Sequence, residues 1–399
     1  MAKKLWQTKD NTSAIASLVN SYTVGNDYIV DSQLLPYDIK ASLAHASMLK
    51  QLKVISNKEL NQLSKGLNEI LAKWQSGKFK ITQGDEDVHT AIENYLIGKL
   101  GSVGKKIHTG RSRNDQVLVI LRLYSKQRLA EILTAAKQLF TVADKLSQKY
   151  QDIPMPGYTH MQPAMPTKVG TWLGSFADAY TDAVEIAKPL QKLLDQNPLG
   201  SGAGFGIPKL ALKPSITTKL LGFNKTQVNP MYAGLSRGLF ESAVLNSLSP
   251  LMIVSGRFAS DMLLFTTKEF GFFSLPQQFT TGSSIMPQKR NYDVFEIMRA
   301  NAHIYLGYQQ QVQSISTSIG SGFQRDLQLT KQPFIAGMEL IIKTLEVLEK
   351  ALSNLKVDSQ RLQQAMTEDL YVTDKVYELV KKGVPFREAY QKVKKELQI

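Results

Sequence analysis

The feature that most constrains this chain is an apolar stripe that continues far beyond the length of an ordinary helix. From Val117 to Leu146, apolar residues recur at spacings of three and four. The pattern persists for about eight helical turns, whereas globular helices usually have about three or four. Met338 to Leu352 repeats it on one face. Stripes of this length are buried only against other long helices, so the sequence predicts a helical bundle.

Three more ranges carry helical periodicity, namely residues 167–194, 237–270 and 293–313. Alternating β-branched runs are few, and no glycine-rich dinucleotide fingerprint follows a predicted strand, which argues against a doubly wound α/β fold. We therefore predict an all-α fold around five long helices. Shorter elements flank them, which divides the chain into an N-terminal helical domain (residues 1–108), a central long-helix bundle domain (109–355) and a small C-terminal helical domain (356–399).

Composition limits the chemistry and the partners. The 399 residues include no cysteine, which excludes disulfides, thiolate metal sites and cysteine nucleophiles. The formal charge of +14 suits either a nucleic acid or a multiply anionic small substrate. The lysines are scattered, and the chain has no zinc-finger spacing, RNA-binding aromatic motif or basic zipper. These features argue against a nucleic-acid partner, and we expect a small-molecule substrate and no nucleic acid, but composition alone leaves the function open.

The sequence shows no sign of targeting. Residues Met1–Gln7 have no apolar stretch behind their lysines, and no window approaches the roughly 18 uninterrupted apolar residues of a membrane span. We expect a soluble, cytoplasmic protein without a membrane partner. Because apolar stripes spread around five long helices leave apolar surface for further subunits, we also expect an oligomer.

The densest polar cluster is His108–Gln116 (HTGRSRNDQ), directly before the longest predicted helix. Backbone N–H groups at the helix start, the helix dipole and the forked guanidinium groups can together hold a carboxylate or a phosphate. The alternative is that Asn114 or Asp115 merely caps the helix and that the arginines are solvated. The residues alone leave both interpretations open.

A second cluster, Gly157–Pro163 (GYTHMQP), places a histidine in a proline-bounded loop ahead of another long helix. A histidine at such a place can move protons near neutral pH. A lone histidine is more often structural, so this cluster by itself does not predict catalysis.

A third cluster, Gly282–Asn291 (GSSIMPQKRN), leads into a helix that carries Glu296. A serine hydroxyl beside cations can act as a base when oriented donors stabilise its alkoxide, and a lysine can stabilise an enolate-like carboxylate. The alternative is a flexible surface loop.

Together, the three clusters resemble the signatures of the fumarase/aspartase superfamily, in the same chain order. Four segments are similar to the argininosuccinate lyase branch of it: Gly84–Glu93 (GDEDVHTAIE), His108–Val117, Gly157–Pro166 and Asp374–Ala389. The resemblance extends from about Val24 to Lys394. It implies a three-domain, all-α, fumarase/aspartase-like fold and a homotetramer in which each active site combines segments of three subunits. It also implies reversible β-elimination of argininosuccinate to arginine and fumarate through a stabilised carbanion, in arginine biosynthesis, with no metal and no organic cofactor.

The resemblance also implies roles for single residues. Ser283 is expected to be the base that removes a proton from the succinyl carbon, and Lys289 with Asn291 to stabilise the carbanion. His160, paired with Glu296, is expected to deliver a proton to the departing guanidino nitrogen. The positions that match substrate-binding residues are His89, Ser112, Arg113, Asn114, Thr159, Arg237, Phe323, Gln328 and Lys331.

The chain departs from the family pattern at a few positions. Arg290 and Tyr292 flank Asn291 where the family usually has a lysine and a proline, which removes a rigid turn. Phe323 stands where the family usually has a tyrosine, and a lost hydrogen bond there costs about 0.5–1.5 kcal/mol. The segment after Gly200 drifts from the pattern, and the chain is short for the family.

Two other classes of function remain open at this stage. Another lyase of the superfamily, acting on adenylosuccinate, aspartate or malate, shares the serine loop and differs at His108–Gln116 and at residues 328–331. A basic nucleic-acid-binding or structural protein without catalysis, like the lens proteins related to this family, does not need the set Ser283, Lys289, His160 and Glu296.

Overall fold

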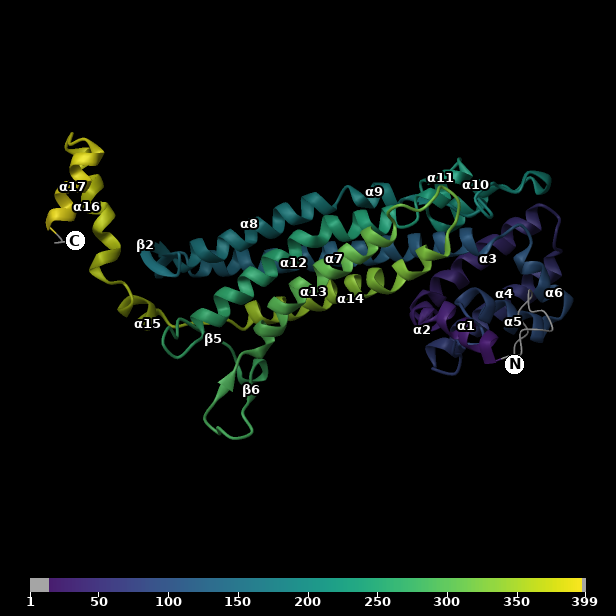
Figure 1. Ribbon diagram of the computed structural model, residues 1–399, viewed down its shortest axis with the longest axis horizontal. Coiled ribbons are helices and arrows are strands. Elements are labelled where there is room, and N and C mark those ends of the chain that lie inside the picture. The colour runs from purple at the N-terminus through teal and green to yellow at the C-terminus, as the bar shows by residue number, and fades with distance from the viewer. Residues whose placement is uncertain (1–13, 397–399) are drawn as a thin grey trace. The chain divides into compact units, whose positions relative to one another are not determined.

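The computed structural model describes residues 14–396, so Met1–Gln7 lie outside the described part. It is predominantly helical, and the five long helices are confirmed (Figure 1). They are α7 (Arg113–Lys149), α8 (Val169–Ala187), α12 (Leu239–Phe265), α13 (Asp293–Ile315) and α14 (Lys331–Ser353). The helix predicted over residues 167–194 is interrupted, because α8 ends at Ala187 and Pro189 precedes the short α9 (Leu190–Leu194).

The chain forms two compact units. The first contains residues up to 132, residues 187–248 and residues 305–340; the second contains residues 133–186, 249–304 and 341 onward. Helices α7, α12, α13 and α14 contribute to both. The division into domains 1–108, 109–355 and 356–399 stays a prediction, and its first 13 and last three residues lie outside the described part.

The first unit adds further helices to the bundle segments. They are α1 (Ala14–Val24), α2 (Asp27–Val30), η1 (Asp31–Leu34), α3 (Leu35–Gln51), α4 (Asn57–Gln75), α5 (Val88–Leu100), α6 (Ser102–Lys105), η2 (Lys106–His108), α9, η3 (Pro208–Leu210), α10 (Pro214–Leu221), α11 (Pro230–Leu235) and η5 (Arg325–Thr330). Local signals set several starts: Ser56 and Glu59 form a capping box on α4, and the Asp87 carboxylate accepts the Thr90 N–H at the start of α5. A parallel strand pair, β3 (Gln196–Asn197) with β4 (Lys225–Thr226), completes the unit.

The second unit carries three antiparallel strand pairs: β1 (Pro154–Thr159) with β2 (Gln162–Lys168), β5 (Phe273–Ser274) with β8 (Lys356–Val357), and β6 (Thr281–Gly282) with β7 (Arg290–Asn291). Its remaining elements are η4 (Gln277–Phe279), α15 (Ser359–Gln364), η6 (Glu368–Tyr371), α16 (Val372–Lys381) and α17 (Phe386–Glu396). Trp172 stacks on Phe258 and Phe273, with ring centroids 5.6 and 4.8 Å apart. These aromatic contacts hold α8, α12 and β5 together.

The prediction of a proline-bounded loop around His160 is wrong, because this segment forms the β1–β2 hairpin. Thr159 pairs with Gln162 across a two-residue turn, and the two turn residues, His160 and Met161, both have positive φ (53° and 63°). Such turns match the twist of the flanking strands. Glycine-free turns of this kind are hard to recognise in a sequence, because non-glycine residues rarely adopt positive φ.

Helix α12 is by length and composition apolar enough to cross a membrane, with a mean hydropathy of 1.3 in its most apolar window. Half of that window is buried within the chain. The core helix of a bundle has the same composition, so a single such helix is weak evidence for a membrane span.

Candidate active site

A cavity of about 230 Å³ in the first unit brings together most of the predicted substrate-binding residues. Those that line it are His89, Arg113, Asn114, Arg237, Phe323, Gln328 and Lys331. Residues that the sequence did not single out line it as well: Val24, Asp27, Glu86, Asp87, Val117 and Arg325. Segments distant in the chain therefore meet at one mixed-charge cavity.

Arg113, the first residue of α7, is oriented by the segment before α5. Its Nη1 lies 3.1 Å from Glu86 Oε2 and 3.1 Å from Asp87 Oδ2, and its Nη2 donates to Thr90 Oγ1 at 2.7 Å. Two carboxylates and a hydroxyl thus orient the guanidinium. A solvated arginine would have no such fixed partners.

Ser112 and Asp115 form hydrogen bonds at the start of α7. The Asp115 carboxylate accepts the Ser112 N–H at 2.8 Å and the Gly200 and Gly202 N–H groups at 3.0 Å each. Asp115 is fully buried, and burial raises its pKa to about 6 against these hydrogen bonds. Asp115 therefore caps α7 and anchors the glycine-rich segment, while Ser112 does not line the cavity and Asn114 does.

Lys331 lies at the back of the cavity in a buried ion cluster. Its ammonium lies 2.7 Å from Asp27 Oδ1 and 2.6 Å from Asp31 Oδ1. Burial raises the pKa of Asp27 to about 6, although Lys331 opposes the shift. Burial lowers the pKa of Lys331, but the two aspartates outweigh it and the net shift is upward. Lys331 is a charged group held in place by carboxylates.

Gln328 and Arg325 tie η5 to the end of α1. The Gln328 side-chain amide donates to the Thr23 carbonyl at 2.9 Å, and Arg325 Nη2 donates to the same carbonyl at 3.1 Å. Gln328 also accepts from Arg325 Nε at 3.2 Å. These bonds close one side of the cavity.

Arg237 and Phe323 form a cation–π contact at the cavity wall. The guanidinium carbon lies 5.1 Å from the ring centroid, and Arg237 Nη2 donates to the Leu327 carbonyl at 3.0 Å. Arg237 is buried, whereas Phe323 is 39% exposed. The Phe323 ring, expected from the resemblance to stand in place of a tyrosine, thus lines the cavity.

In the second unit, Thr159 and His160 lie at the exposed tip of the β1–β2 hairpin. Tyr158 anchors the hairpin, since its ring contacts those of Phe265 and Phe270 at 6.0 and 5.7 Å. The hairpin also packs against α15 and η6. The rest of the protein therefore fixes the base of the hairpin, and its histidine projects from the tip.

Ser283 lies in the loop between β6 and β7. Its hydroxyl oxygen accepts the Met286 N–H at 3.1 Å and the Ile285 N–H at 3.4 Å. Two N–H donors directed at one oxygen are the arrangement that stabilises an alkoxide. Lys289 is exposed at the end of this loop, Asn291 is the last residue of β7, and Glu296 lies in the first turn of α13.

Tyr292, one of the expected departures from the family pattern, is restrained by hydrogen bonds. Its hydroxyl accepts the Leu275 N–H at 3.1 Å and donates to the Leu275 carbonyl at 3.4 Å. Arg290 takes part in the β6–β7 pairing, opposite Gly282. The base of the serine loop is therefore held by hydrogen bonds to Leu275, directly after β5, and by strand pairing.

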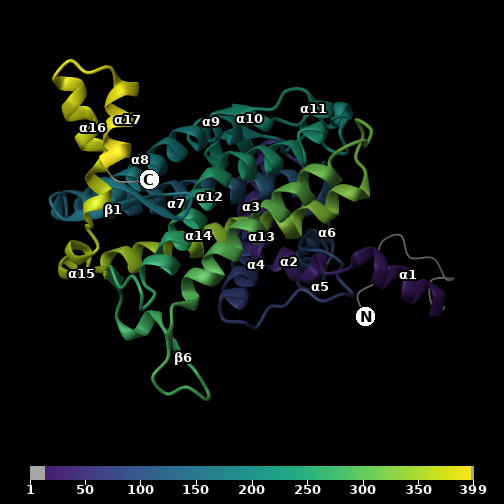
Figure 2. The same cartoon turned by 60° about the vertical axis from the view of Figure 1, so that its left-hand side comes forward.

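Within the second unit of one chain, the His160 hairpin and the Ser283 loop are apart. Figure 2 shows the hairpin beside α15 and the β6–β7 loop projecting at another place. In the described part of the chain, no hydrogen bond or ion pair joins His160 to Glu296 or Ser283. The pairing of His160 with Glu296 is thus not made within this chain.

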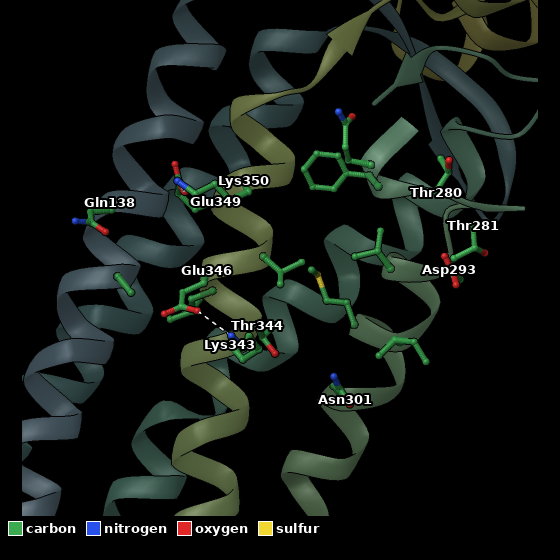
Figure 3. Close-up of a pocket in the computed structure, with 18 residues that line it drawn as sticks. Gln138, Thr280, Thr281, Asp293, Asn301, Lys343, Thr344, Glu346, Glu349 and Lys350 are labelled. Atoms are coloured by element: carbon green, nitrogen blue, oxygen red, sulfur yellow. Dashed lines mark ion pairs between the residues drawn. The ribbon is translucent and has the colours of Figure 1, made fainter. Parts of the chain in front are cut away.

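A larger cavity, about 950 Å³, lies in the second unit, among α7, α13 and α14 (Figure 3). Its polar lining includes Gln138, Asp293 and Asn301, and Lys343 forms an ion pair with Glu346 at 3.5 Å. None of the predicted site residues lines it. Size alone therefore does not identify the active site. Among residues 14–396, no group of three or more His, Asp or Glu side chains is arranged to hold a metal ion.

Comparison with known proteins identifies the family. A family model described as "Lyase" matches residues 12–306. The chain is 42% identical to an argininosuccinate lyase of Thermotoga neapolitana, over 98% of both chains. It is 41% identical to that of Sorangium cellulosum, over the whole of this chain and 91% of the other, and 38% identical to that of Bacteroides fragilis, over 98% and 87%. The chain belongs to the argininosuccinate lyase family.

Solved structures agree with this family's fold. An EDDS lyase variant with bound fumarate superposes with a TM-score of 0.80 at 22% identity, over 94% of this chain and 74% of the other. A class II fumarase from Schistosoma mansoni superposes with a TM-score of 0.76 at 18% identity, over 94% and 91%. The predicted all-α, fumarase/aspartase-like fold is confirmed. The short length of the chain is shared with the argininosuccinate lyase of Thermotoga neapolitana.

Proposed function

We propose that this protein is an argininosuccinate lyase, which splits argininosuccinate reversibly into arginine and fumarate by β-elimination. The observation that carries this proposal is the identity of about 40% with argininosuccinate lyases along the whole chain. The retained segments of the three signature clusters and the cavity lined by His89, Arg113 and Asn114 support it.

The cavity's charges suit this substrate. Argininosuccinate carries three carboxylates together with an ammonium and a guanidinium group. The cavity offers Arg113, Arg237, Arg325 and Lys331 to the carboxylates, and Glu86 and Asp87 to the cationic groups. A purely basic cavity would leave the cationic groups of the substrate without partners, and buried unpaired charges are costly.

The chemistry begins at the serine loop. Ser283, as alkoxide, removes a proton from the succinyl carbon, and the electron pair passes into the adjacent carboxylate. Lys289 and Asn291 stabilise the dianion that forms, and the N–H groups of Ile285 and Met286 stabilise the alkoxide beforehand. Because a carbon acid beside a carboxylate is weakly acidic, this stabilisation supplies much of the rate enhancement.

The bond between the carbon and the guanidino nitrogen then breaks, and fumarate forms. His160, paired with Glu296, delivers the proton that the departing nitrogen needs. Thr159, beside His160 on the hairpin, completes the substrate contacts, whereas Ser112 acts at the start of α7 and not in the cavity. These steps are proton transfers between substrate and side chains, so the proposed reaction uses no metal and no organic cofactor.

The assembly proposed for this reaction is a homotetramer with active sites shared between subunits. The His160 hairpin and the Ser283 loop do not meet within the second unit of one chain, so a partner subunit must bring one of them. Helices α12 and α13 present apolar side chains that a single chain leaves exposed, including Ile253 (45%), Ile297 (62%) and Ile304 (47%). Burial of these side chains between subunits would explain why apolar residues lie on the surface of a single chain.

The proposed setting is arginine biosynthesis in the cytoplasm, without nucleic-acid or membrane partners. A cysteine-free chain whose basic residues are scattered is compatible with this setting. Because the reaction releases arginine, it would serve amino-acid biosynthesis.

The deciding experiment follows fumarate by its ultraviolet absorbance with purified protein. Argininosuccinate should give fumarate, and adenylosuccinate, aspartate and malate should give rates lower by at least about a hundredfold. A preference for another member of this panel would refute the proposal in favour of a different superfamily lyase. Salt-dependent DNA binding without any lyase activity would support the non-enzymatic alternative.

A further inference from the structure

A buried ion pair lies directly behind the cavity of the first unit. The Asp38 carboxylate oxygen Oδ2, from α3, contacts Nδ1 of His89, in the first turn of α5. Asp38 is 1% exposed and His89 is 6% exposed. Burying two such groups is costly unless they are well paired, so this contact is a specific feature of the fold.

The surroundings hold Asp38 in one orientation. The Ser42 hydroxyl donates to the other carboxylate oxygen, Oδ1, at 2.8 Å. Arg111 Nη1 donates in turn to the Ser42 hydroxyl at 2.9 Å. Asp38 itself does not line the cavity, so its action on a substrate must pass through His89.

His89 connects this network to the cavity. Because Nδ1 faces Asp38, Nε2 on the other side of the imidazole is left for the cavity that His89 lines. Among residues 14–396, the hydrogen bond that this ring makes is the one through Nδ1. Arg113 and Asn114 line the same cavity.

Electrostatics agree with this geometry. Burial alone would lower the pKa of His89, but Asp38, followed by Asp87 and Asp31, raises it above the ordinary value. Burial alone would raise the pKa of Asp38, but His89, Arg111 and Ser42 lower it. His108 is a further titratable neighbour of His89, and burial lowers the pKa of His108. Both directions correspond to an imidazolium paired with a carboxylate.

We propose that Asp38 is a positioning residue, which holds the His89 imidazolium so that Nε2–H donates to a carboxylate of the bound substrate. This role deepens the proposed function and rests on it. Asp38 touches no substrate; it sets the orientation and the charge of the ring that does. The pairing through Nδ1 selects the donor atom, as a carboxylate does for other functional histidines.

The test compares the KM for argininosuccinate of the wild type, Asp38→Asn, His89→Gln and the double variant between pH 5.5 and 8. In Asp38→Asn, burial makes His89 neutral as the pH rises, so KM should increase about tenfold by pH 8 and less at pH 5.5, with kcat within about threefold. In His89→Gln, the rise in KM should not depend on pH. The double variant should resemble His89→Gln, because Asp38 acts through that ring.

Two further variants separate positioning from simple destabilisation. Ser42→Ala keeps the carboxylate but frees one of its oxygens, so its KM should rise about two- to threefold with the same trend in pH. Ser255→Ala removes a buried hydrogen bond to Tyr180, 3.1 Å long, and serves as the matched control, with unchanged KM at every pH. If Asp38→Asn does not fold, Ser42→Ala decides the question.

Folded Asp38→Asn with wild-type KM, or with a change that is equal at all pH values, would overturn the positioning role. The same holds for Ser42→Ala with wild-type KM if Asp38→Asn does not fold. A wild-type protein that produces no fumarate from argininosuccinate would refute the proposed function and the positioning role with it. Active wild type with unaltered variants refutes the positioning role alone.

Discussion

Phe323→Tyr adds one hydroxyl at the wall of the cavity in the first unit. The ring is 39% exposed, lines the cavity and lies beneath the Arg237 guanidinium at 5.1 Å. A tyrosine hydroxyl at the edge of such a ring reaches the cavity or solvent and is not trapped in apolar packing. Its addition should therefore change the free energy of unfolding by less than about 0.5 kcal/mol.

The gain in catalysis follows from one hydrogen bond to the substrate. A net value of about 0.5–1.5 kcal/mol corresponds to a two- to tenfold rise in kcat/KM, since a factor of ten is about 1.4 kcal/mol. The Arg237 contact should persist, because tyrosine and phenylalanine rings both attract a guanidinium. Fumarate production gives kcat/KM, and a thermal melt of the same preparation gives stability.

Phe323→Leu is the control for the ring itself. It removes the cation–π partner of Arg237 and should lower kcat/KM, whereas Phe323→Tyr should raise it. Unchanged or reduced kcat/KM in Phe323→Tyr would show that the cavity has been rebuilt around an apolar ring. A drop in stability of about 1–3 kcal/mol would show that the hydroxyl is buried without a partner, contrary to the exposure of the ring.

Four further outcomes are expected. Ser283→Ala should abolish elimination while substrate binding stays within about tenfold, and near-normal turnover would exclude this serine as base. Inactive Ser283→Ala and inactive His160→Asn proteins, reassembled together, should regain part of the wild-type activity; fully active monomers in sedimentation would contradict shared sites. Tyr292→Phe loses two hydrogen bonds at the base of the serine loop, so kcat should fall about three- to tenfold, and an unchanged kcat would show that the loop needs no such restraint. Asp38→Asn should lose about 3–5 kcal/mol of unfolding free energy. The loss should be full between about pH 4 and 6.5, because folding lowers the pKa of Asp38 from 3.8 and raises that of His89 from 6.5. It should shrink as the pH rises through the raised pKa of His89 or falls through the lowered pKa of Asp38. Urea titrations at several pH values measure this loss.

The long helices could be predicted from the sequence because their signal is local. An apolar stripe at helical spacing can be recognised without knowing what it packs against. The starts of α4 and α5 depend on capping contacts between residues three positions apart. The polar clusters were equally local, and their residue types and order indicated the family. The roles proposed for Ser283, His160 and Lys289 follow from that indication and stay predictions.

The β1–β2 hairpin could not be predicted in the same way. Its turn residues, His160 and Met161, adopt positive φ although neither is glycine, and the strands that flank them have no alternating pattern. What holds the hairpin is the packing of Tyr158 on Phe265 and Phe270, which come from the end of a helix and the segment after it. Tertiary packing outweighs weak local preference here.

The sequence by itself determined the helical class, the long stripes and the identity of the polar clusters, because each depends on neighbours along the chain. Only the tertiary structure decided which of those polar groups share a cavity. Asp38 and His89 are separated by 51 positions, and Lys331 pairs with Asp31 across 300. Such contacts arise when distant segments are buried together and their charges must be paired, a requirement that no spacing in the sequence reveals.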